Sequence, residues 1–262
     1  TSPGSTRRPH SPLEIQKSPN SPPDGRTIGL AAMAALCVSP VMPGQKLPIN
    51  VDTDLTPIAN IVGVYNMLVV GKHVPYRTVP ELIAYAKANP GKLTYASAGN
   101  GTSQHLAGEL FKKMAGVDIL HVPYRGGAPA IQDMISGNVS MMFGNMPEFL
   151  GQIAGGNLIP VAFGAPRQSP MFPKLPLISQ YLPGFSVVNW FAVFGSKGLP
   201  TDLVDFWNKA LRTAVAKPEV QKRFEESGMD TIIGSPADLK ATIVADRKKW
   251  AEVIKEAGMR AD

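Results

Sequence analysis

The turn from Ser97 to Thr102 combines the residue types that proteins use to hold a small anion. It reads Ser-Ala-Gly-Asn-Gly-Thr and leads from a predicted strand into a predicted helix. The first N–H groups of a helix have no partner within it, and the helix dipole adds partial positive charge there. Gly99 and Gly101 let the backbone come close to a ligand, and Thr102 or Ser103 can cap the helix or donate a hydroxyl. We therefore predict an anion site, with a plain tight turn and helix cap as the alternative.

Two further turns that follow predicted strands carry polar side chains, and in a parallel sheet all three turns lie at the ligand-binding edge. In the first of these, Arg125 offers a planar fork of donors that suits a carboxylate, with a surface charge as the alternative. Tyr124 offers a hydroxyl there, and Gly126-Gly127 begins another helix. In the other turn, Asn145 can hydrogen-bond a ligand or simply form the turn. His105, at the third position of its helix, either faces the glycine turn or is a structural hydrogen-bonding residue.

The chain lacks a recognisable catalyst. The segment from Gly99 to Gln104 has the first two glycines of a dinucleotide fingerprint but not the third, and no Asp or Glu ends the following strand. Arg125 stands there instead, which leaves an NADP-dependent oxidoreductase open as an alternative. Walker, esterase and zinc-protease motifs are absent, the four histidines lie far apart, and no two carboxylates are placed for acid–base work. We therefore predict no enzymatic activity, no catalytic residue, no metal and no cofactor.

Composition narrows the class of protein further. The 262 residues are 44% hydrophobic and 18% charged, which suits a folded chain with one large core or two smaller ones. The net charge of +6 suits an anionic ligand, but Lys and Arg are scattered and no nucleic-acid motif is present, so no nucleic-acid partner is expected. A single cysteine, Cys37, excludes an internal disulfide. The apolar segment Ile28 to Val38 is predicted as a buried strand with the turn after it, rather than as a signal segment.

From residue 78 onwards, helix and strand patterns alternate. Thr78, with Glu81 three residues later, predicts a capping box, and Asn89-Pro90-Gly91 ends that helix. Short glycine-containing connections then separate strands from helices, which predicts a mostly parallel sheet covered on both faces. Strands are expected at 93–96, 119–124, 139–143, 158–163, 187–194 and 231–233. Helices are expected from the glycine turn to Gly116, from Ala128 to Gly137, and at 147–154, 201–216, 218–227 and 236–257.

Two proline-rich connections, residues 39–57 and 165–185, bracket the most regular part of the chain. The pieces outside it cannot each bury a core alone, so we expect them to pair as a second lobe. The predicted divisions are an irregular Pro/Ser arm at 1–23, lobe I formed by 24–71 plus 188–262, and lobe II at 72–187. The chain then crosses twice between lobes, as hinge-closing binding proteins do, with a ligand cleft between them. Trp190, on the strand that re-enters lobe I, is a core residue or a wall of this cleft.

Two long motifs resemble a receptor signature. Residues 95–109 read YASAGNGTSQHLAGE and residues 121–130 read HVPYRGGAPA, and both closely resemble the tripartite tricarboxylate transporter substrate-binding proteins, also called Bug receptors. Shorter matches lie at 23–27, 55–59 and 250–258. The resemblance extends over about residues 22–262. It implies a periplasmic α/β protein with the two-lobed Venus-flytrap fold, which would deliver small carboxylates to a membrane permease.

The resemblance also implies that the three turns line the ligand cleft. With the candidates from the residues themselves, the predicted ligand-binding set is Ser97, Gly99, Asn100, Gly101, Thr102, His105, Tyr124, Arg125, Gly126, Ala128, Asn145 and Trp190.

The sequence departs from the family in two places. Members usually begin with a strand, a loop of the type P-x-P-P-G-G and a helix, and this loop supplies the outer lobe's half of the ligand grip. Residues 1–21 do not match it, so we expect an incomplete outer lobe, with a ligand-binding-defective, receptor-like interaction protein as an alternative. Many members carry Asp at the position of Gly144, and glycine there predicts a plain carboxylate ligand rather than an amino acid.

Overall fold

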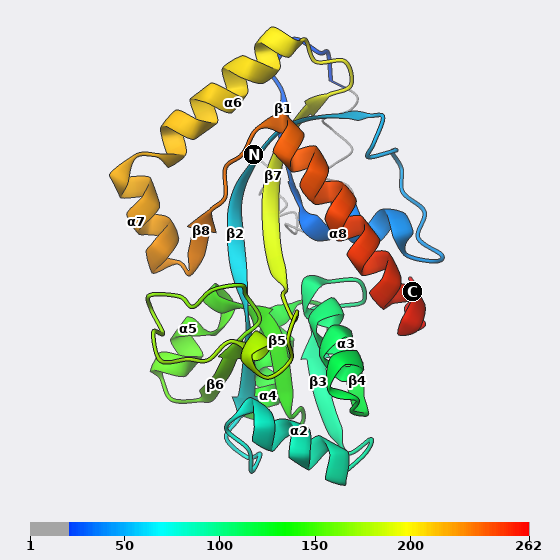
Figure 1. Ribbon diagram of the computed structural model, residues 1–262, viewed down its shortest axis with the longest axis vertical. Helices are drawn as coiled ribbons and strands as arrows, with labels where there is room; N and C mark the ends of the chain where they lie inside the picture. Colours follow the sequence, from blue (N-terminus) through cyan, green and yellow to red (C-terminus); the bar gives the residue numbers. More distant parts are fainter. Residues whose placement is uncertain (1–20, 262) are drawn as a thin grey trace, which may run out of the picture.

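The computed structural model describes residues 21–261, and Figure 1 shows how their elements are arranged. Strand β2 (Leu55–Gly71) is the longest of the described strands, at 17 residues, and it extends from the upper part of the molecule in Figure 1 into the lower part. It pairs with one set of strands along its first part and with another set along its last part. Two groups of strands therefore share β2. The predicted Pro/Ser arm lies outside the described residues except for its last three.

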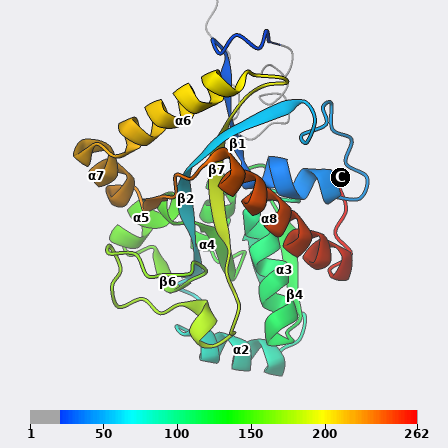
Figure 2. The same cartoon turned by 45° about the horizontal axis from the view of Figure 1, so that its top comes forward.

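The first group of strands is antiparallel throughout. Strand β1 (Ile28–Ala32) pairs with β7 (Val188–Ser196), and β7 pairs with β2 as far as Tyr65. The short strand β8 (Met229–Thr231) also pairs with β2. The helices of this group are α6 (Thr201–Val215), α7 (Pro218–Glu226) and α8 (Pro236–Glu256). Figure 2 shows the helical segment η1 (Ala34–Val38), which follows β1, lying against α8.

The second group of strands contains the parallel part of the sheet. Strand β3 (Leu93–Ser97) pairs in parallel with both β4 (Ile119–Pro123) and β5 (Met141–Asn145). Strand β2 is antiparallel to β5 and to β6 (Leu158–Phe163). The helices of this group are α2 (Val79–Ala88), α3 (Ser103–Ala115), α4 (Gly127–Ile135) and α5 (Met146–Ala154). Because β3, β4 and β5 are parallel, the turns after them lie at one edge of the sheet.

A continuous apolar core joins the two groups of strands. The rings of Phe111, Phe143 and Phe185 pack together in the second group, with centroids 5.5–6.3 Å apart. The same cluster of buried side chains extends to Trp190 on β7 and Trp250 on α8. The two groups are therefore held together by packing as well as by β2.

The structure confirms much of the predicted element order. The capping box of Thr78 and Glu81 is present at the start of α2, and β6 has the predicted bounds. The prediction of a strand and turn over 28–38 is wrong beyond Ala32, because the chain turns helical in η1.

The prediction of a mostly parallel sheet is correct only for β3, β4 and β5. Sequence periodicity marks a strand but not its direction, and β2 enters the sheet antiparallel to β5. Strand β2 also begins before Pro57, which was expected in a connection; a shift of register beside this residue accommodates its missing N–H. The partners of β2 change between Tyr65 and Asn66, and the division into lobes after residue 71 stays a prediction.

Candidate ligand-binding site

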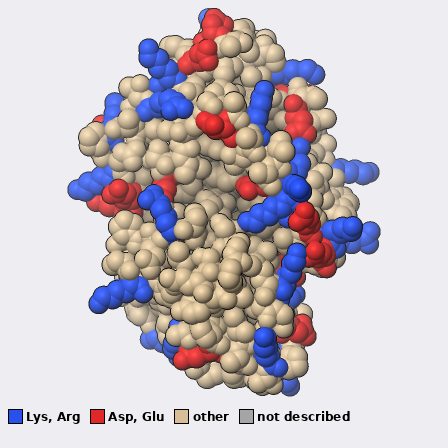
Figure 3. All heavy atoms as spheres, viewed as in Figure 1, with Lys and Arg blue, Asp and Glu red and all other residues tan. Residues whose placement is uncertain are grey.

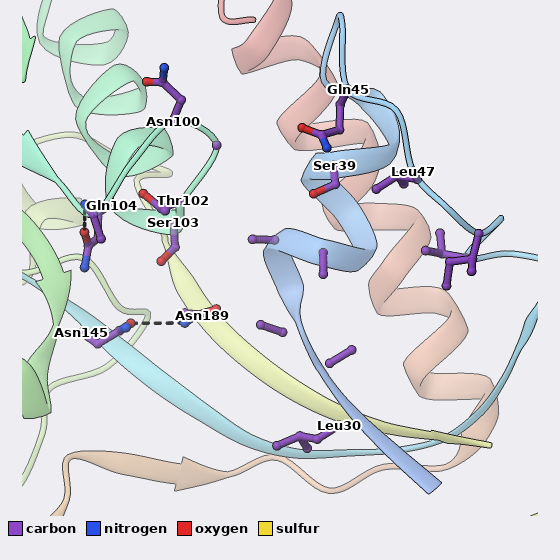
Figure 4. Close-up of a pocket in the computed structure, with 18 of the residues that line it drawn as sticks. Leu30, Ser39, Gln45, Leu47, Asn100, Thr102, Ser103, Gln104, Asn145 and Asn189 are labelled. Atoms are coloured by element: carbon purple, nitrogen blue, oxygen red, sulfur yellow. Dashed lines mark hydrogen bonds between the residues drawn. The ribbon is translucent and has the colours of Figure 1, made fainter. Parts of the chain in front are cut away.

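A cavity of about 330 Å³ lies between the two groups of strands, within the size range of small-molecule sites. The second group contributes the turn after β3 and the starts of α3 and α5. The first group contributes β1, η1, the loop that follows them and Asn189 of β7. Figure 4 shows side chains from both sides facing the cavity. Its polar lining residues are Ser39, Gln45, Asn100, Thr102, Ser103, Gln104, Asn145, Glu148 and Asn189.

The glycine turn after β3 forms one wall of the cavity. Gly99 and Gly101 have φ angles of 132° and 74°, which residues with a Cβ rarely adopt. Thr102 closes the turn because its hydroxyl donates to the Gly99 carbonyl at 2.8 Å and accepts from the His105 N–H at 3.4 Å. Thr102 is therefore the N-cap of α3, as the sequence predicted for Thr102 or Ser103.

Backbone N–H groups of the turn have partners in the turn or in the first turn of α3. The Gly99 N–H donates to the Ser97 hydroxyl at 3.2 Å, and the Gly101 N–H donates to Nδ1 of His105 at 3.3 Å. Ser103 and Gln104 occupy the first two positions of α3, where N–H groups have no helical acceptor, and both line the cavity. The donors available to an anion therefore lie at the start of α3 rather than at the glycines.

Two stacked histidines lie behind the glycine turn. The rings of His105 and His121 are 3.8 Å apart between centroids, with 13° between their planes. Nε2 of His121 is 2.7 Å from the Ser97 hydroxyl, and Ser97 is completely buried. His105 and Ser97 therefore support the turn from behind. Neither of them, nor Gly99, is among the residues that line the cavity.

A network of amides joins the two groups of strands across the cavity. The Asn145 side chain donates to Oε1 of Glu148 at 2.7 Å, and the Gln104 side chain donates to Oε2 at 2.9 Å. From β7, Asn189 donates to the Asn145 oxygen at 3.4 Å, and Figure 4 shows these two side chains pointing toward each other. Burial raises the pKa of Glu148, and the hydrogen bonds from Asn145 and Gln104 oppose that shift. Asn145, from the third predicted turn, therefore lines the cavity, whereas none of the candidate residues of the second turn does.

The turn after β4 lies beside the glycine turn but outside the cavity lining. The Tyr124 N–H donates to the Ser97 carbonyl at 2.9 Å, which places the two turns next to each other. The Tyr124 hydroxyl donates to Asp133 at 2.7 Å; burial and this hydrogen bond raise the pKa of Tyr124 to about 12. Arg125 and Ala128 are exposed, and Gly126 precedes α4 with a φ of 121°. None of the four lines the cavity.

Trp190 belongs to the core rather than to the cavity lining. Its side chain is 3% exposed, and its indole N–H donates to Asp246 of α8 at 2.6 Å. Burial raises the pKa of Asp246, and the indole hydrogen bond opposes that shift. The core interpretation of Trp190 therefore fits its position.

Several lining residues were missed from the sequence. Gln104 and Glu148 sit in the first turns of α3 and α5, and His105 was the one residue predicted to bind the ligand from within such a turn. Asn189 offered a signal, since it is a polar residue within an apolar strand, and it is 5% exposed. The loop from Gln45 to Val51 offered none, because its place depends on how the first group packs.

Three further features of the described residues concern surface charge, metal ligands and membrane-spanning helices. Figure 3 shows Lys and Arg interspersed with Asp and Glu over the face in view. Among residues 21–261, no group of three or more His, Cys, Asp or Glu residues could hold a metal ion. No helix in the described part of the chain is long and apolar enough to cross a membrane.

Two groups of strands on one shared strand, with a cavity between them lined by hydrogen-bonding groups, define a two-lobed ligand-binding receptor. The family model described as "Tripartite tricarboxylate transporter family receptor" matches residues 11–259. The chain belongs to this family of solute-binding proteins, as the sequence motifs predicted.

Individual relatives support the same assignment. The chain is 32% identical over 244 residues to the "UPF0065 protein in tcbD-tcbE intergenic region" of Pseudomonas sp. (strain P51), with 92% of this chain and 72% of that protein covered. It is 30% identical over 238 residues to protein BugT of Bordetella pertussis, with 90% and 73% covered.

Solved structures confirm the predicted two-lobed α/β fold. R. palustris Rpa4515, solved with adipate, superposes with a TM-score of 0.86 at 30% identity, covering 95% of this chain and 83% of that one. The periplasmic binding protein BugD gives a TM-score of 0.81 at 27% identity, with 96% and 84% covered.

Proposed function

We propose that this protein is an extracytoplasmic receptor that captures a small carboxylate in the cavity between its two groups of strands. The observation that carries the proposal is the start of α3, where Ser103 and Gln104, whose backbone N–H groups have no helical acceptor, line the cavity. Unsatisfied N–H groups and the positive end of a helix dipole favour a carboxylate. The adipate in the R. palustris relative is a ligand of this class.

We further propose that the receptor works in the periplasm and delivers its ligand to the membrane permease of a tripartite tricarboxylate transporter. Membership of the receptor family supports this partner, and BugD supports the compartment. The grip is made of backbone N–H groups and neutral side chains apart from Glu148, which suits reversible capture and release rather than bond making. On this proposal the protein has no catalytic residue and uses no cofactor.

A screen of C4 to C6 carboxylates by thermal melting tests the proposal. A ligand present at a hundred times its Kd stabilises a one-site protein by about 2.7 kcal/mol. For a chain of this size each kcal/mol moves the Tm by roughly 2–4 °C, so the correct ligand raises the Tm by about 5–10 °C. An unchanged Tm with every carboxylate would overturn the proposal.

The two alternatives from the sequence predict different results. A ligand-binding-defective, receptor-like interaction protein shows no melting shift with any carboxylate. An NADP-dependent oxidoreductase binds NADPH and changes its fluorescence, although Arg125, which motivated this alternative, is exposed outside the cavity lining.

A further inference from the structure

Glu148 is the one ionisable residue among those that line the cavity. Neither Lys, Arg nor His is in this set, although the protein carries a net charge of +6. A dicarboxylate that enters therefore meets no protein cation at the cavity wall, and it meets one protein carboxyl group. A receptor for plain dicarboxylates gains nothing from that group, since like charges repel in a partly desolvated site.

The contacts of Glu148 leave capacity for a further donor. Its two oxygens accept one side-chain amide hydrogen each, from Asn145 at 2.7 Å and from Gln104 at 2.9 Å, and the Asn145 backbone N–H also donates to the carboxyl group. An ionised carboxylate offers about four acceptor positions, so these three bonds do not saturate it. Glu148 forms no ion pair with any residue in the described part of the chain. The side chain is half-buried, and the residue is among those that line the cavity.

The surroundings of Glu148 hold the carboxyl group at the cavity. Gly127, at the start of α4, leaves room for it, because a Cβ there would be 2.7 Å from Oε2. Gln104 reaches it from α3, a different helix, so the contact goes beyond what the first turn of α5 needs. Burial raises the pKa of Glu148, as expected for a carboxyl group that lacks a cationic partner. A ligand cation or N–H donor would supply that partner.

The start of α3 and Glu148 are close together. Gln104 links them, because its backbone N–H belongs to the first turn of α3 while its side chain donates to Glu148. A small molecule can therefore place a carboxylate at the start of α3 and a nitrogen at Glu148. We propose that Glu148 is the specificity-determining residue of this receptor, and that the ligand is a small carboxylate that also carries an ammonium group.

This inference rests on the proposed function and revises one expectation from the sequence. Glycine at position 144 predicted a ligand without an amine, because it removes an acid that many family members have there. In this structure a Cβ on Gly144 would lie 2.4 Å from the ring of Phe149, so the position has no room for a side chain. Glu148, one turn further along, supplies the acid instead.

Isothermal calorimetry with two matched ligand pairs tests the inference. Succinate against aspartate and glutarate against glutamate differ only by the ammonium group. For the wild-type chain, one amino compound should bind about tenfold or more tightly than its partner, the range of a charge-assisted hydrogen bond. Glu148→Gln should remove this preference by weakening the amino compound while the plain dicarboxylate binds as well as before or better. Glu225→Gln, an exposed residue, is the control for net charge.

The outcomes separate the inference from the function on which it rests. Equal or stronger wild-type binding of the plain dicarboxylates overturns the inference and leaves the carboxylate receptor intact. Equal weakening of both members of a pair in Glu148→Gln also overturns it, because a merely structural residue would act in this way. If none of these four ligands binds, and no carboxylate in the C4 to C6 melting screen shifts the Tm, the proposed function is overturned, and the inference with it. Glu148→Asp, which keeps the charge, should retain part of the preference.

Discussion

Replacement of Gly101 by alanine tests whether the conformation of the glycine turn controls ligand binding. Gly101 has a φ of 74°, and a residue with a Cβ pays roughly 1–2 kcal/mol to adopt that region. The added Cβ would lie 3.2 Å from the end of the flexible Met42 side chain and 3.9 Å from Val38, an ordinary contact, so steric overlap adds little. We therefore expect the free energy of unfolding to fall by about 1–2 kcal/mol. The backbone should relax toward negative φ and move the start of α3, which follows directly.

Gly116 provides a matched control for this variant. It ends α3 with a φ of 61°, and a Cβ there would have nothing within 4 Å. Gly116→Ala should lose about the same stability, measured by urea unfolding, without any change at the cavity. Calorimetry should show that Gly101→Ala alone weakens carboxylate binding by about tenfold to a hundredfold, the value of one hydrogen bond to a charged group. Equal affinity in the two variants would refute the role given to the turn.

Two further predictions concern the core and pH. Trp190→Phe removes the donor to the half-buried Asp246 carboxylate, and we expect urea unfolding to show a loss of about 1–3 kcal/mol while carboxylate affinity stays at the wild-type value. Reduced affinity with unchanged stability would instead place Trp190 in the cleft wall. Burial raises the pKa of Glu148 above its ordinary 4.5, so its contribution to stability is present below that pH and is lost as pH rises through the folded-state pKa. The Tm of Glu148→Gln relative to wild type should therefore increase from pH 4 to pH 7, and a constant difference would contradict this.

Local chemistry explains what could be predicted from the sequence. The Thr78 and Glu81 capping box and the Thr102 cap depend on residues three apart, and both formed where expected. The glycine turn could be predicted because glycines and hydroxyl residues between a strand and a helix are typical of an anion-binding turn. The stacking of His105 on His121 was not predicted, since it depends on how α3 packs against β4.

Long-range pairing explains most of what could not be predicted. Asn145 meets Asn189 only because β7 and β5 both flank β2, and no periodicity reports that arrangement. Arg125 and Trp190 have the right chemistry for a ligand site, but Arg125 lies exposed in the turn after β4 and Trp190 is directed to the core from β7. Glu148 escaped notice because it reads as an ordinary acidic residue in the first turn of a helix.

The continuous strand β2 makes the two halves of this receptor thermodynamically inseparable. It is flanked on both sides by strands of each group, so the loss of either half would leave part of β2 without hydrogen-bonding partners in a sheet. A chain built in this way should unfold in a single cooperative transition rather than half by half. It should also fold slowly, because β2 and β7 lie far apart in the sequence and must meet before either half is complete. Motion between the halves then has to twist β2, which stores elastic energy, and cannot be a free swing about loops alone.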